Sequence, residues 1–211
     1  MSSTSIPEDE LTITIPEPEI DTIHNVTVSQ KNKNRETGGV LLGGRLSETE
    51  IFCMRATRPG PEAEQYKTEF APDVEYAQDI IDNLREDFDV VWIGTWHKHP
   101  GSLNELSRGD IQQMKEFIND PELLDEILAV ITTIEGDTVR INPFYMDKRH
   151  TIGRVNIKVI GANKTQEKLN QLKNSNDIDT RSNLAMKNQN EPFSNQNKST
   201  TEIIKDILRR I

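Results

Sequence analysis

The sequence has one cysteine, few aromatic residues and no long apolar run. A single cysteine, Cys53, excludes an internal disulfide and any zinc site built from several cysteines, and we expect it to be a small buried hydrophobe. Aromatic residues make up 5% of the chain and hydrophobic residues 34%. The low apolar content predicts either a small core or segments that lie outside it.

The charge balance is acidic, with a formal net charge of -10 over 211 residues. A nucleic-acid partner would normally require a basic face, so we expect none. The first residues, MSSTSIPEDELTI, lack the basic and apolar regions of a signal peptide, and no stretch approaches the roughly 18 apolar residues that span a bilayer. We therefore expect a cytoplasmic protein with no membrane association.

Hydrophobic periodicity predicts a flexible N-terminus at 1–10 and one domain of mixed α/β order at 11–160. Apolar alternation or short apolar runs predict strands, and three- to four-residue spacing predicts helices. The expected strands cover 11–15, 35–45, 50–57, 89–96, 126–134, 138–146 and 151–160, and the expected helices 74–88 and 108–119, with a weaker helix at 19–30. Trp92 and Trp96, four apart on one strand, are expected to pack on the same side.

Beyond residue 160 the composition changes. Residues 161–199 are rich in Asn, Gln, Lys, Ser and Thr, which predicts a polar linker with a helical start. At 200–211 an apolar stripe predicts an amphipathic helix, which would pack on its own domain, form a dimer or recruit a partner. The stripe consists of Ile203, Ile204, Ile207, Leu208 and Ile211.

The stretch GTWHKHPGSLNELSRGD contains the candidate site. His97 and His99 are two residues apart at the end of a predicted strand, so both imidazoles can point to one side and bind one metal ion. Asp110, in the first turn of the next helix, is the nearest candidate for a third zinc ligand. The same aspartate also forms a capping-box pattern with Ser107, which requires no metal.

Taken together, His97-Lys98-His99-Pro100, six residues and then Ser107-Arg108-Gly109-Asp110 resemble the signature of the JAMM metalloproteases of the MPN domain family. Glu36, in RETGGVLLGG, matches the upstream glutamate of that family. The resemblance implies an α/β fold with a mixed central sheet flanked by helices, similar to cytidine deaminase. It also implies one Zn2+ per chain on His97, His99 and Asp110, with Glu36 as general base and Ser107 as oxyanion donor.

The resemblance further implies an isopeptidase or peptidase that cleaves after the C-terminal glycine of a ubiquitin-like protein or its conjugates. Activating and conjugating enzymes of the same pathway would then be partners. The loops 58–70 and 100–106 are expected to form the walls of the substrate groove. Two alternatives remain: an inactive MPN scaffold that recruits a partner through 200–211, and a zinc hydrolase of small peptide or amino-acid adducts.

Overall fold

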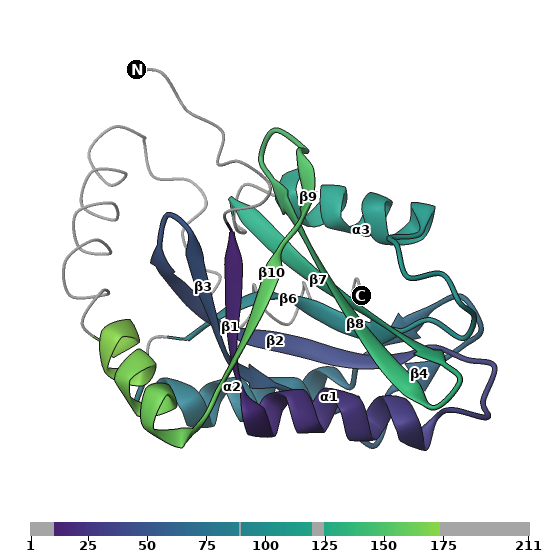
Figure 1. Ribbon diagram of the computed structural model, residues 1–211, viewed down its shortest axis with the longest axis horizontal. Helices are drawn as coiled ribbons and strands as arrows, with labels where there is room; N and C mark the ends of the chain where they lie inside the picture. Colours follow the sequence, from purple (N-terminus) through teal and green to yellow (C-terminus); the bar gives the residue numbers. More distant parts are fainter. Residues whose placement is uncertain (1–10, 89, 120–124, 174–211) are drawn as a thin grey trace, which may run out of the picture.

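The computed structural model of the chain describes residues 11–88, 90–119 and 125–173. Within these residues the core is an eight-stranded mixed sheet in the order β10-β1-β3-β2-β6-β7-β8-β9 (Figure 1). Its strands are β1 (Thr12–Pro16), β2 (Thr37–Ser47), β3 (Glu50–Ala56), β6 (Val91–Lys98), β7 (Glu126–Glu135), β8 (Thr138–Asp147), β9 (Ile152–Arg154) and β10 (Asn156–Ile160). A separate two-stranded hairpin pairs β4 (Glu64–Gln65) with β5 (Phe70–Ala71). The predicted mixed α/β class is confirmed.

Helices cover both faces of the sheet, which gives three layers. α1 (Glu17–Ser29) packs Ile23 and Val26 into one apolar cluster with residues of β1, β3 and β6. α2 (Val74–Arg85) and α3 (Arg108–Asn119) pack on the opposite face, around Trp92 and Met146. α1 contains several β-branched residues, which favour strands, but burial against the sheet outweighs that local preference.

A bulge in the middle of β6 decides which side chains face which layer. The pairing with β2 runs from Leu41 opposite Gly94 to Leu42 opposite Trp92, so one residue of β6 is skipped. Gly94 has a φ of 151°, and a Cβ there would lie 2.0 Å from the carbonyl oxygen of Leu128. Trp92 therefore packs on the α2/α3 side and Trp96 on the α1 side. The expectation that the two tryptophans share one side is wrong.

The other expected elements are found close to their predicted bounds. The segment 151–160 is divided into β9 and β10, and the loop 58–73 contains the β4–β5 hairpin. Cys53 is fully buried and unpaired. No helix in the described part of the chain is long and apolar enough to cross a membrane.

The described part of the chain continues past β10 into a helix at residues 162–173. This helix, at the left of Figure 1, packs Leu169 and Leu172 against Phe52 and Met54 of β3. Leu172 is 1% exposed, so part of the polar segment contributes to the core. The predicted helix at 200–211 lies outside the described residues.

Candidate metal centre

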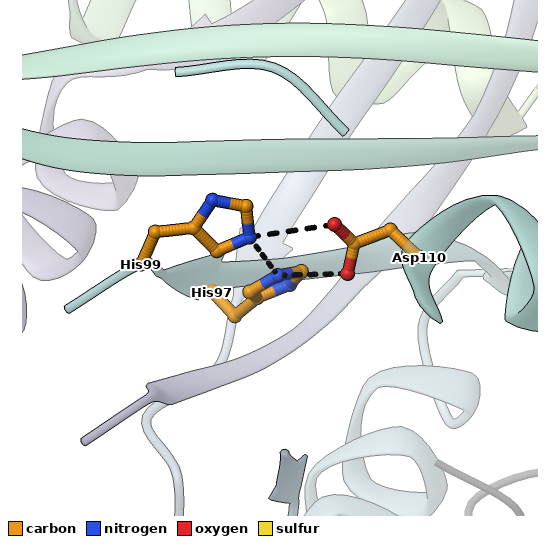
Figure 2. Close-up of side chains that lie close together, drawn as sticks. All are labelled: His97, His99 and Asp110. Atoms are coloured by element: carbon orange, nitrogen blue, oxygen red, sulfur yellow. Dashed lines mark hydrogen bonds and ion pairs between the residues drawn. The ribbon is translucent and has the colours of Figure 1, made fainter. Parts of the chain in front are cut away.

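Two imidazoles and one carboxylate converge where β6 ends and α3 begins (Figure 2). β6 is held on both sides, antiparallel to β2 and parallel to β7, with His97 opposite Gly38 and Ile131. Because strand side chains alternate, His97 and His99 point to the α2/α3 side. Asp110 reaches them from the first turn of α3. The structure thus brings together the three ligands expected from the sequence.

The distances between the three groups match a single tetrahedral ion. The Nε2 atoms of His97 and His99 are 3.1 Å apart, and those atoms lie 3.2 and 3.3 Å from the two carboxylate oxygens of Asp110. Zinc with ligand bonds of about 2.0–2.1 Å separates tetrahedral ligand atoms by about 3.3 Å. All three side chains are largely buried, so a metal ion that bound here would displace little water from them.

The orientation of His99 also favours a cation. Its Nδ1 lies 2.7 Å from the carbonyl oxygen of Leu103, which can only accept, so Nδ1 carries the hydrogen. In a neutral ring, the Nε2 lone pair then faces His97 Nε2 and Asp110. Such a convergence of lone pairs and negative charge is unfavourable unless a proton or a metal ion lies between them.

The ionisation of the site is consistent with this arrangement. Burial alone would lower the pKa of His99, yet hydrogen bonds to Asp110 and Leu103 and the charges of Asp110 and Glu36 raise it. Burial opposes ionisation of Asp110, but the two imidazoles and the Ser107 N–H hold the pKa of Asp110 well below its ordinary value. The Asp110 carboxylate therefore stays ionised, and a bound cation can neutralise its charge.

Asp110 also forms the capping box that the sequence offered as an alternative. The Ser107 N–H donates to Asp110 Oδ2 at 2.6 Å, and the Asp110 N–H donates to Ser107 Oγ at 3.1 Å. The two interpretations are compatible, because a carboxylate has several acceptor positions. The start of α3 fixes the carboxylate, and the Ser107 hydroxyl keeps its hydrogen free to donate elsewhere.

Glu36 and Ser107 line the same cavity as His97 and Asp110. This cavity has a volume of about 260 Å³, and its remaining lining residues are Thr68, Glu69, Phe70, Thr95, Gly109 and Gln113. Burial raises the pKa of Glu36, the two histidines oppose this, and Asp110 adds to it. A raised pKa suits a carboxylate that takes up and releases a proton near neutral pH.

The walls of the cavity differ in part from the expected ones. Thr68, Glu69 and Phe70 belong to the loop 58–70, as expected for one wall. The start of α3, rather than the loop 100–106, forms the facing wall, and that loop instead holds the His99 ring through Leu103. Sequence reasoning also missed Thr95, although alternation along β6 places it on the same side as His97.

Gly38 allows β2 to pass close to the candidate metal ligands. A Cβ at this position would lie 2.1 Å from the carbonyl oxygen of Trp96 and 2.8 Å from His97 Cβ. These approaches are far below van der Waals contact, so any side chain at residue 38 would displace β2 or β6. Gly38 therefore has a packing role directly beside His97.

Comparison with known proteins agrees with this geometry. Residues 24–145 match the family model described as prokaryotic homologs of the JAB domain, more than half of the chain. The chain belongs to this family. Its resemblance to the JAMM/MPN proteins is thus confirmed, and the family includes zinc metalloproteases.

A solved structure shows the same fold. The JAB-domain chain resembles the solution structure of protein DSY2949 from Desulfitobacterium hafniense with a TM-score of 0.52 and 18% identity. The match covers 71% of this chain and 94% of the other, and at this identity it supports the fold alone. No curated protein matches the sequence.

Proposed function

We propose that this JAB-domain protein is a zinc-dependent isopeptidase or peptidase that cleaves after the C-terminal glycine of a ubiquitin-like protein or its conjugates. The observation that carries the proposal is the convergence of His97, His99 and Asp110 within 3.1–3.3 Å, with His97 and Asp110 lining one cavity together with Glu36 and Ser107. A structural role alone would not require two buried imidazoles and a carboxylate to face one another.

His97, His99 and Asp110 would hold the zinc ion, with one position left for water or substrate. When bound, zinc supplies Lewis acidity and lowers the pKa of water towards neutrality. The Glu36 carboxylate accepts a proton from the attacking water and delivers it to the leaving amine. The Ser107 hydroxyl, whose oxygen already accepts from the Asp110 N–H, donates its hydrogen to the developing oxyanion.

The substrate class is proposed from the family and from the size of the cavity. A volume of about 260 Å³ lies below the range of about 300–1,000 Å³ usual for small-molecule pockets. Glycine residues at a scissile bond suit such a space, because they need no side-chain pocket. Enzymes that activate and conjugate the same ubiquitin-like protein would be the functional partners.

Zinc content and cleavage of a Gly-Gly fusion test the proposal together. Wild type should contain one zinc per chain by elemental analysis, and His97→Ala/His99→Ala should contain almost none. Glu36→Gln should keep the zinc but lose about 10²–10⁴-fold in kcat, because only the proton acceptor is removed. Cleavage that persists in Glu36→Gln would refute the assigned role of Glu36.

The same measurements separate the alternatives. Wild type without zinc after reconstitution would favour the inactive scaffold. Wild type with zinc that cleaves short peptides or amino-acid adducts but no folded ubiquitin-like fusion would favour the small-substrate hydrolase.

A further inference from the structure

Lys98 lies between the two histidines and points to the opposite side of the sheet. It is 2% exposed, which makes it one of the most deeply buried charged side chains among the described residues. A buried ammonium is costly unless its hydrogen bonds are satisfied. Its partners therefore indicate what this lysine is for.

The Lys98 ammonium binds backbone carbonyls just ahead of Glu36. Its Nζ donates to the carbonyl oxygens of Lys33 and Arg35, each at 3.3 Å. Helix α1 has already ended at Ser29, so these are loop carbonyls and the lysine is no cap of that helix. The contact joins the strand that carries the histidines to the segment that carries the glutamate.

The segment before Glu36 is held from two distant parts of the chain. Lys98 binds its carbonyls at residues 33 and 35, and the Glu36 N–H donates to the carbonyl oxygen of Tyr66 at 2.7 Å. After Glu36, β2 begins with Thr37 directly opposite Lys98. Glu36 thus sits between a strand in fixed register and a loop whose path depends on the lysine.

We propose that Lys98 is a positioning residue that fixes the segment 33–36, and so directs the Glu36 carboxylate toward the cavity that contains His97 and Asp110. The proposal rests on the proposed function for its consequence in catalysis, but the positioning itself does not. In this arrangement three consecutive residues, His97 and Lys98 at the end of β6 and His99 just after it, place both parts of the site. The histidines face the metal on one side, and the lysine holds the glutamate's loop from the other.

The test replaces Lys98 with methionine, which keeps most of the chain length and removes the donors. Amide hydrogen exchange at residues 33–36 should become about tenfold faster or more, because the segment loses two hydrogen bonds to its backbone. Zinc content should stay at the wild-type level, since His97, His99 and Asp110 are all unchanged. With a cleavable substrate, kcat should fall about 10–100-fold because Glu36 is misplaced. KM should change little, because the surfaces that bind the substrate are unaltered.

Two controls keep the result interpretable. Lys33→Gln alters a side chain of the same loop but leaves the backbone carbonyl that Lys98 binds. Amide exchange at residues 33–36 and kcat in this variant should therefore match wild type. Lys98→Arg retains donors and should restore part of the exchange protection that Lys98→Met loses. Should Lys98→Met not fold, the side-chain amine protons of wild-type Lys98 can be observed by nitrogen-edited NMR. Slow exchange of these side-chain protons with solvent supports the proposed hydrogen bonds of Lys98 to the segment 33–36, and rapid exchange contradicts them.

Unchanged exchange at residues 33–36 in folded Lys98→Met would overturn the proposal, as would an unchanged kcat. A failure of the proposed function is distinguishable. If wild type cleaves no substrate, the exchange measurement still decides whether Lys98 holds the segment.

Discussion

Replacing Gly38 with alanine should damage the metal centre from beneath. The added Cβ would lie 2.1 Å from the Trp96 carbonyl oxygen and 2.9 Å from the Cα of His97. Closest approaches of such atoms are about 3 Å or more, so β2 and β6 must separate locally by about 1 Å. The contact atoms are backbone, which cannot rotate away as a side chain can.

The size of the effect follows from the tolerance of the metal site. Forcing extra volume into a packed interior costs about 1–3 kcal/mol of unfolding free energy. Zinc ligand distances must hold to about 0.2 Å, and a shift of His97 by several tenths of an ångström exceeds that. We therefore expect zinc affinity to fall about 10–100-fold, as it does when the surroundings of a ligand are disturbed.

Urea unfolding in the presence of a chelator measures the loss of unfolding free energy. Competition with a chromophoric zinc chelator measures the loss of zinc affinity. Gly109→Ala is the matched control, because its Cβ would meet only Ser107 Oγ, at 3.5 Å. Alanine is favoured over glycine in a helix by about 1 kcal/mol, so this variant should be as stable as wild type or more stable. Wild-type zinc affinity in Gly38→Ala would refute the argument that the close approach of β2 sets the position of His97.

Three further predictions address pH, the cap and the C-terminal boundary of the fold. The raised pKa of His99 means that protonation stabilises the metal-free fold below about pH 6.5, and this contribution is lost as the pH rises through the raised value. Zinc requires the unprotonated ring, so the increase in Tm on adding zinc should be larger at about pH 7.5 than at about pH 5.5; the reverse order would contradict this. Ser107→Ala should lose about 1 kcal/mol of stability through the lost cap and about 10²–10³-fold in kcat while retaining zinc, and unchanged kcat would rule out its role at the oxyanion. Leu172→Ala should cost about 2–5 kcal/mol in urea unfolding, whereas a neutral result would place residues 162–173 outside the cooperative fold.

Much of the metal centre could be predicted from local pattern. The two-residue spacing of His97 and His99 required only that a strand alternate its side chains, and the Ser107–Asp110 spacing required only a helix start. Glu36 is different, since no local pattern distinguishes it from a solvated glutamate. Its prediction came from resemblance to the family, and the structure places it in the shared cavity.

Features that depend on pairing between distant segments could not be predicted from the sequence. The bulge at Gly94 arises from the pairing of β6 with β2, and an isolated stretch of apolar residues gives no sign of it. The burial of Lys98 depends on where the segment after α1 passes, which is a property of the tertiary fold. Local periodicity therefore predicted the candidate ligands but not the contact of Lys98 with the neighbouring segment.

The bulge also has a consequence for how this site tolerates change. β6 lies between two paired strands and has no free edge, so a shift by one residue would turn both histidines toward α1 and bring the Lys98 ammonium to the metal's place. The bulge at Gly94 leaves one residue of β6 unpaired and so reverses the alternation of side chains at that point. Trp92 in the first half of the strand can therefore pack in the α2/α3 cluster while the histidines at its end face the same side. Without the bulge, Trp92 and His97 would face opposite sides of the sheet. Either the tryptophan would leave its apolar cluster or the histidines would leave the candidate site.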